Sequence, residues 1–370
     1  MPAVRSRIRS ASVAGAAFAL VLAAGGCGGA GSGGGTPVTL VVPDKSLTAT
    51  TASYTSVPIQ AGYFDDEKLD VTVQPVDNAL SAVQAVATGQ AFMTYASTGA
   101  AAAAAAKDDG LAVIGLTNGN MFRVVVPEDS AIKEPADLAG KTVGANSLAS
   151  ATALNAKAVV GEAGLAPESD VEYLPVGYGA QAADAMRSGD IDAYSGYDGP
   201  NVVIADLLDG EFRDIPSPIN DITGTSALVV AKESIENRPD DVAGLARAFF
   251  KSMVFAEENP EAAIEMHWAE FPQSKSAEMS DEEALKQSVR IVSARLKATG
   301  GEGPDGRFGV QEAADMDETM ELFARYKIIP SKVDLADDGI LDYSLADSYN
   351  KFDADAVREE AASWKQDQGD

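Results

Sequence analysis

An internal repeat constrains the fold of this chain more than any other feature. Residues 71–99 and 171–199 align without a gap, with identical residues at the paired positions Gly89 and Gly189 and at Gly99 and Gly199. Both copies read as strand, proline, loop, amphipathic helix, glycine, strand, polar turn, glycine and helix. We interpret the repeat as one βαβ unit that is used once in each of two similar lobes.

The rest of the chain continues this alternation of short apolar runs and longer helical patterns. The predicted strands and helices up to residue 116 alternate in the order strand 38–42, helix 53–64, strand 71–73, helix 79–87, strand 92–95, helix 99–107 and strand 112–116. Such alternation is typical of parallel βαβ units, so we expect an α/β fold with helices on both faces of mainly parallel sheets. From residue 239 to the end the pattern is mostly helical.

The length of 370 residues exceeds the usual size of one domain, which predicts two lobes. Two breaks, near residues 118–121 and 219–225, would allow the chain to cross to a second lobe and return. We therefore expect lobe I to hold residues 37–120 and 225–370, and lobe II to hold residues 121–224.

The N-terminus has the pattern of an export signal. Residues 1–26 combine an arginine-rich start, an apolar stretch and small residues before Cys27, which indicates a signal peptide. The position of Cys27 resembles the lipobox of bacterial lipoproteins, so we expect lipidation there, with residues 27–36 as a Gly/Ser tether. The alternative is a plain secreted protein with one unpaired thiol. Either way the expected location is outside the cytoplasmic membrane, and with the lipid the chain is anchored to its outer face.

Composition excludes several classes of function. The formal net charge of -28 argues against nucleic acid as a partner. The chain has one cysteine and one histidine, His267, so neither a disulfide nor a histidine-based catalytic or zinc site can be assembled easily. No glycine-rich nucleotide-binding loop follows a strand. We expect a monomer that is not an enzyme and holds no cofactor or metal.

Several motifs resemble those of one family of solute-binding proteins. They are Gly62-Tyr63-Phe64, Leu69–Val71, Ala87–Gln90, Asp137–Gly144, Gly164-Leu165, Ser188–Ala193, Phe308–Val310 and Ile328–Pro330. With them the chain is similar to the binding proteins of the nitrate, sulfonate, taurine and thiamine-precursor ABC importers, a family that includes the fungal thiamine-pyrimidine synthases. The resemblance implies a two-lobed fold of the type II periplasmic-binding-protein kind, a solute held in the cleft, hinge closure, and delivery to an ABC permease and its ATPase.

Candidate binding residues follow the predicted strands, where loops lead into helix N-termini. The candidates share a hydroxyl, ring or polar group at such a junction or at the first crossing; they are Thr51, Tyr54, Thr55, Ser97, Thr98, Asn120, Arg123, Ser147, Ser150, Thr152, Tyr178, Tyr197 and Asp198. A helix N-terminus can hold an anion or a carbonyl oxygen without a lysine, whereas Asp198 would prefer an amine. Arg123 is the cation expected to pair with an anion.

The candidate residues do not identify the solute or the role of the protein. A sulfonate or taurine, nitrate, and a thiamine-type pyrimidine would each match some of these residues. The alternatives to transport are a ligand-sensing surface lipoprotein and a two-lobed enzyme related to the thiamine-pyrimidine synthases. The fungal synthases carry a cysteine-rich motif that this chain lacks, which weighs against the enzyme.

Overall fold

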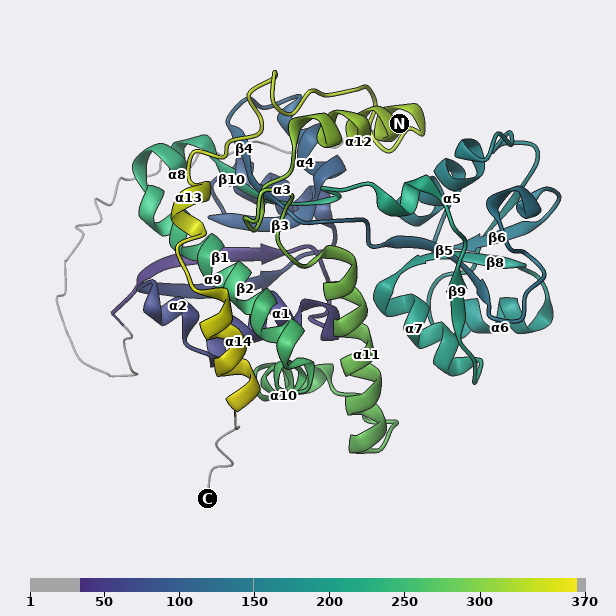
Figure 1. The fold of residues 1–370 in the computed structure, drawn as a ribbon, viewed down its shortest axis with the longest axis horizontal. Helices are drawn as coiled ribbons and strands as arrows, with labels where there is room; N and C mark the ends of the chain where they lie inside the picture. The colour runs from purple at the N-terminus through teal and green to yellow at the C-terminus, as the bar shows by residue number, and fades with distance from the viewer. Residues whose placement is uncertain (1–33, 149, 365–370) are drawn as a thin grey trace, which may run out of the picture. The chain divides into compact units, whose positions relative to one another are not determined.

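Two five-stranded sheets organise the part of the chain that the computed structural model describes, residues 34–148 and 150–364. Helices flank each sheet, and each sheet with its helices forms a lobe (Figure 1). The predicted α/β class with two lobes is therefore confirmed. The expected signal peptide, residues 1–26, and Cys27 lie outside the described residues.

The first sheet has the strand order β2-β1-β3-β10-β4. Its strands are β1 Thr36–Val42, β2 Leu69–Pro75, β3 Met93–Ser97, β4 Leu111–Leu116 and β10 Ser226–Ala231. The helices between them are α1 Ala52–Gln60, α2 Tyr63–Asp66, α3 Ala79–Ala87 and α4 Thr98–Ala105, and a short 3-10 turn, Ala49–Thr51, precedes α1. All six residues of β4 are buried, because apolar clusters cover both faces of this sheet.

The second sheet has the strand order β7-β6-β8-β5-β9. Its strands are β5 Phe122–Pro127, β6 Thr142–Ala145, β7 Glu172–Pro175, β8 Ala193–Tyr197 and β9 Phe212–Asp214. The helices are α5 Ala151–Glu162, α6 Ala180–Ser188 and α7 Asp198–Leu207, with 3-10 turns at Pro135–Leu138 and Pro218–Asp221. Two further apolar clusters cover its faces.

The two sheets confirm the interpretation of the repeat. The first copy forms β2, α3, β3 and the start of α4, and the second copy forms β7, α6, β8 and the start of α7. Both sheets also share the same spatial order, with β3 and β8 at their centres. The repeated sequence is thus the same structural unit in two lobes.

One strand in each sheet runs against the other four. β10 pairs antiparallel with β3 and β4, and β5 pairs antiparallel with β8 and β9. Both are the first strands after a crossing between the lobes. The chain enters each new sheet at the carboxyl ends of its parallel strands. The entering strand must therefore run antiparallel to them.

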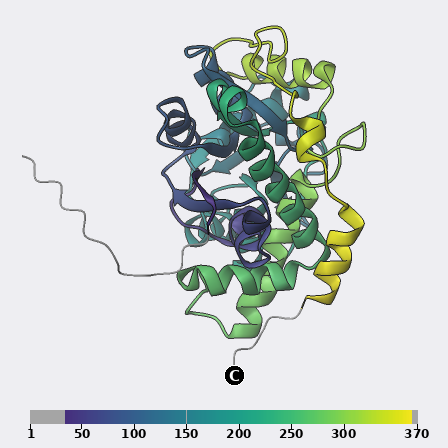
Figure 2. The same ribbon diagram turned by 90° about the vertical axis from the view of Figure 1, so that its left-hand side faces the viewer.

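The C-terminal third is helical, as expected, and mostly covers the first lobe. It forms α8 Lys232–Asn237, α9 Pro239–Glu258, α10 Pro260–Glu270, α11 Asp281–Thr299, α12 Ala313–Arg325, α13 Ala346–Tyr349 and α14 Ala354–Ser363, with a 3-10 turn at Pro272–Ser274. The long helix α9 is buried between α1 and α14. Figure 2 shows the yellow C-terminal helix beside the green helices of this layer.

The prediction of a single helix over 53–64 is wrong in its extent. The chain forms α1 up to Gln60 and a separate short helix, α2, from Tyr63. Gly62 between them has a φ of 74°, a left-handed conformation that ends a helix and that glycine adopts without strain. The other predicted elements lie within a few residues of the observed ones.

Among the described residues no helix is both long and apolar enough to span a bilayer.

The close packing around β6 gives a first prediction. A methyl group added at Gly144 would lie 2.6 Å from Cδ1 of Ile191 and 2.9 Å from Cγ2 of Val176. We expect Gly144→Ala to lower the free energy of unfolding by about 1–3 kcal/mol, because an overpacked core must shift. The matched control is Gly210→Ala in the same lobe, where the nearest atom would be 3.8 Å away. Urea unfolding measures both; equal stabilities would contradict the packing of β6.

Candidate functional site

The two crossings between the lobes lie side by side and are joined by hydrogen bonds. Asn120 donates from Nδ2 to the carbonyl of Ile219 at 2.9 Å, and Thr225 donates from Oγ1 to the carbonyl of Gly119 at 3.0 Å. The Oδ1 atom of Asn120 accepts from the backbone N–H of Phe122 at 3.0 Å. Asn120 therefore joins the two crossings through its Nδ2, while its Oδ1 is bound within its own segment, so both ends of its amide are occupied.

A cavity of about 290 Å³ lies beside the crossings, between the two lobes. The first turn of α4 and the first turns of α5 face it, so two helix N-termini converge there. Its polar lining residues are Ser97, Asn120, Asn155 and Thr225; the others are apolar or glycine, including Leu80, Phe122, Leu154, Ile219, Ile222 and Phe323, and none is charged. A cavity with an apolar wall and a few polar groups is the usual form of a small-molecule site.

Asn155 is the polar group of this cavity that lacks a full set of partners. Its side chain is buried, with 4% of the residue exposed, and its Nδ2 has no hydrogen-bond partner among the described residues. A buried donor without a partner costs free energy. An acceptor atom of a bound solute would satisfy it. Sequence reasoning missed Asn155, which lies inside a helix and not at a strand end.

A buried ion pair joins the lobes at the start of α7. Nε and Nη2 of Arg295 in α11 donate to the two carboxylate oxygens of Asp198 at 2.5 and 3.0 Å. Only 9% of the Arg295 side chain and 3% of the Asp198 side chain are exposed. Oδ1 of Asp198 also accepts from the N–H of Gly199 at 2.7 Å. The carboxylate predicted to repel an anion is therefore neutralised by an arginine that the sequence did not single out.

Tyrosine rings form a wall near this ion pair. Tyr54 and Tyr95 of the first lobe meet edge to face with centroids 5.1 Å apart, and Tyr178 and Tyr197 of the second lobe meet in the same way at 6.0 Å. Burial raises the pKa of Tyr54 and that of Tyr197, and the charge of Asp44 acts in the same direction on both. These phenols stay protonated at neutral pH and can donate hydrogen bonds.

Asp44 follows β1 and was not a predicted site residue. Burial raises the pKa of its carboxyl group, while the positive charge of Arg295 lowers it. Burial raises the pKa of Tyr178 in the other lobe, and the charge of Asp44 acts in the same direction. Its sequence context, a loop directly after the first strand, is a signal that could have identified it.

Arg123 lies on the other side of the crossings from the 290 Å³ cavity. It lines a separate cavity of about 350 Å³ that also touches Asp198, Asp214 and α11. Its Nη1 donates to the carbonyl oxygens of Asn120 and Phe122, and its Nε lies 3.2 Å from Asp214. The expectation that Arg123 would be the cation placed to meet an anion is thus corrected. Arg123 is already paired, and Arg295 is the buried cation at the tyrosine wall.

Most of the remaining predicted residues either cap a helix or are buried. Ser97 and Ser150 cap α4 and α5 by accepting from the N–H groups of Ala100 and Ala153. Thr51 and Thr55 donate to backbone carbonyls one turn earlier, so their hydroxyls are used within the first helical segment. Of the rest, Ser147 is exposed beside Ser150, Thr152 is buried with its hydroxyl 2.8 Å from that of Ser150, and Thr98 is buried with no partner for its Oγ1 among the described residues.

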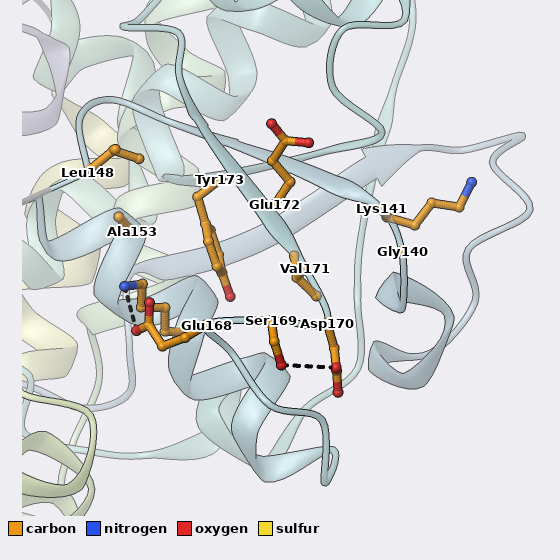
Figure 3. A pocket seen from close by; sticks show the side chains of 11 residues that line it. Gly140, Lys141, Leu148, Ala153, Glu168, Ser169, Asp170, Val171, Glu172 and Tyr173 are labelled. Atoms are coloured by element: carbon orange, nitrogen blue, oxygen red, sulfur yellow. Dashed lines mark hydrogen bonds and ion pairs between the residues drawn. The ribbon is translucent and has the colours of Figure 1, made fainter.

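A larger hollow of about 510 Å³ lies on the second lobe alone, next to β7 (Figure 3). Its lining mixes both charges: Glu168 pairs with Lys157 at 2.8 Å, and Ser169 donates to Asp170 at 3.2 Å. It contains none of the predicted binding residues. Because it lies on one lobe alone and contains no predicted residue, we assign no ligand to it.

The one histidine is part of the packing of the first lobe. His267 is fully buried in α10; its Nε2–H donates to the carbonyl of Leu47 at 3.1 Å, and its Nδ1 lies 2.5 Å from the hydroxyl of Ser56, which donates to it. Ser56 is also fully buried, so this serine–histidine pair has no exposed surface to offer a substrate. Among the described residues no group of three or more His, Cys, Asp or Glu is placed to hold a metal ion.

The ion pair provides a second prediction. Arg295→Met leaves Asp198 buried and unpaired, so we expect a loss of about 3–5 kcal/mol in the free energy of unfolding, measured with urea. The double variant Arg295→Met/Asp198→Asn removes both charges and should lose much less than the sum of the two single variants. Additive losses would show that the two side chains do not interact.

His267 provides a third prediction, which concerns pH. Burial lowers its pKa to about 4, below the value of about 6.5 expected in the unfolded chain. The unfolded state therefore binds the proton more tightly, and the histidine's contribution to stability falls as the pH drops from 6.5 to 4, by about 3 kcal/mol in total. His267→Gln should remove that part of the pH dependence. Identical profiles of urea midpoint against pH would overturn the assignment.

Proteins of known structure share this fold. The periplasmic aliphatic sulphonate binding protein SsuA from Escherichia coli gives a TM-score of 0.61 at 16% identity, over 81% of this chain and 90% of its own. The alkanesulfonate-binding protein SsuA from Xanthomonas axonopodis pv. citri, bound to MOPS, gives 0.58 at 16% identity, over 82% and 97%. A mutant of the desulfurization enzyme DSZB in complex with biphenyl-2-sulfinic acid gives 0.54 at 14% identity, over 85% and 99%. At these identities the likeness establishes the periplasmic-binding-protein fold and not the ligand.

The sequence family is established by a separate comparison. No curated protein sequence matches the chain. Residues 53–263, however, match the family described as NMT1/THI5 like. This match covers more than half of the chain and includes both copies of the repeat and most of the residues around the cleft. The chain therefore belongs to the NMT1/THI5-like family.

Proposed function

We propose that this protein is the extracytoplasmic solute-binding component of an ABC importer. It captures a small molecule in the cleft between its lobes and closes around it without chemistry. The observation that carries the proposal is the uncharged 290 Å³ cavity between the lobes, beside the crossings that would act as the hinge. The family and the fold of the sulfonate-binding proteins support it.

The proposal keeps the predicted lobes, and it keeps the predicted binding residues except Arg123, which is paired with Asp214, and Thr98, which does not line the cavity. The lobes would comprise 37–120 with 225–370, and 121–224. The predicted residues around the cleft, together with Asn155, Arg295 and Asp44, would form the site. Cys27 would carry a lipid that anchors a monomer to the outer face of the cytoplasmic membrane, where the permease and its ATPase receive the solute.

The apolar wall of the cavity narrows the choice of solute. Burying apolar surface contributes about 25 cal/mol per Å², so an organic body gains from this wall and nitrate does not. The two helix N-termini and Asn155 favour an acceptor group at one end. A sulfonate with an organic body or a thiamine-type pyrimidine fits these features better than nitrate or taurine.

The competing functions are a sensor and an enzyme. A sensor would bind a solute in the same cleft and would differ only in its partner. The structural likeness to DSZB is the observation that favours an enzyme. The described part of the chain offers such chemistry only the fully buried Ser56–His267 pair, which argues for binding alone.

A fourth prediction tests the site. Alkanesulfonates, taurine, nitrate and an aminopyrimidine are screened by thermal unfolding, where a solute at a hundred times its Kd stabilises the protein by about 2.7 kcal/mol. For any solute that binds, Asn155→Leu should weaken affinity by about 1 kcal/mol, since a hydrogen bond is lost. The matched control is Thr98→Val, which also removes a buried polar atom without a partner, but outside the cavity lining.

The outcomes separate the alternatives. A solute that binds the parent chain and loses affinity only in Asn155→Leu supports both the function and the cavity. Equal loss in both variants would show that the loss does not come from the hydrogen bond of Asn155, and would contradict our placement. Absence of any response across the panel would contradict the proposed solute classes.

A further inference from the structure

Two C-terminal helices connect the lobes, and they do so by different chemistry. α11 packs on α9 and α10 of the first lobe and also lies along α7 of the second lobe, as Figure 1 shows. α12 packs on the first lobe and contacts α5 of the second. We call these contacts the α7/α11 interface and the α5/α12 interface.

The α7/α11 interface is held by charge. Besides the buried pair of Asp198 with Arg295, Asp206 accepts from Nε2 of Gln287 at 2.9 Å and forms an ion pair with Arg290. Asp198 at the start of α7 thus contacts the later part of α11, and Asp206 near the end of α7 contacts the earlier part of α11. The two helices therefore run antiparallel. Ala205, Ala294 and Ala298 are among the small residues that line the 350 Å³ cavity between them.

The α5/α12 interface is mainly apolar and lies against the second crossing. Leu322 of α12 is part of the apolar core of the second lobe, and the ring of Tyr326 lies so close to Gly161 that a Cβ there would be 2.5 Å from it. Thr319 donates to the carbonyl of Thr223 in the crossing at 3.0 Å. An ion pair between Glu162 and Arg325 lies at the edge of this interface.

The two interfaces differ in what separation would cost. Separating α12 from α5 would expose Leu322 and the core residues around it to water, which opposes opening. Separating α7 from α11 would return charged groups to water, and their hydration offsets much of the lost attraction. If the lobes open, α7 and α11 should therefore separate, and the lobes should rotate about the α5/α12 interface.

We propose that the α7/α11 interface is the gate of the cleft, and that its ion pairs keep the lobes closed before any solute binds, while α12 stays attached to both lobes at the hinge. The proposal goes beyond the proposed function, because it concerns how the lobes part before any solute binds. It makes the ligand-free population of open protein sensitive to salt.

Two buried alanines allow the interfaces to be probed separately. Ala205 is 3% exposed in α7 and lines the cavity against α11, whereas Ala158 is 2% exposed in α5 and lines the cavity against α12. Cys27 is the only cysteine of the chain, so in a Cys27→Ser background each of Ala205→Cys and Ala158→Cys introduces a single thiol. The rate of its reaction with 5,5′-dithiobis(2-nitrobenzoate) reports how often it is exposed.

One charge of the α7/α11 interface is then removed on α11, the helix that faces the labelled Ala205→Cys in α7. We expect Arg290→Gln to speed the labelling of Ala205→Cys by about 1.5- to 5-fold, as for the loss of a partly exposed ion pair, and to leave Ala158→Cys unchanged. Raising the salt from 0.1 to 1 M should act in the same direction, because it shortens the screening length. The matched control is Glu162→Gln, which removes an interlobe ion pair at the hinge side and should leave the labelling of Ala205→Cys unchanged.

Each other outcome contradicts the gate. Equal acceleration of both thiols would mean global unfolding or a different axis of opening. An unchanged rate for Ala205→Cys in Arg290→Gln and in high salt would mean that the ion pairs do not hold the interface. The experiment uses no solute, so its failure leaves the proposed function standing, and a failed solute screen leaves the gate testable.

Discussion

The buried ion pair between Asp198 and Arg295 links the two lobes of this protein. It fixes the first turn of α7 against α11. It also removes the net charge that Asp198 alone would bring to the cleft.

The hinge and the cavity depend on each other through the crossings. The hydrogen bonds from Asn120 and Thr225 hold the two crossing segments together, and these same residues form one wall of the cavity. A rotation of the lobes must therefore change the cavity. This coupling is what a binding protein needs, because a solute can shift the balance of open and closed forms only if it interacts differently with them.

Sequence reasoning succeeded where the signal was local. The repeat predicted one βαβ unit in each of two lobes, and the hydroxyls of Ser97 and Ser150 were correctly expected at helix starts. It was less successful for side-chain partners. Arg123 was expected to pair with an anion, but it is bound to Asp214 and to backbone carbonyls. Successive residues of a strand face opposite sides, so Phe122 lines the 290 Å³ cavity and Arg123 lines the other one.

The sequence by itself determined the βαβ units, their use in two lobes and the positions of the crossings, because hydrophobic periodicity, glycines and prolines act over a few residues. Only the tertiary structure decided which groups meet. Arg295 and Asp198 are 97 residues apart, and Asn155 is inside a helix with no special local pattern. Contacts of that kind depend on how helices pack across two sheets, and no property of the neighbouring residues encodes them.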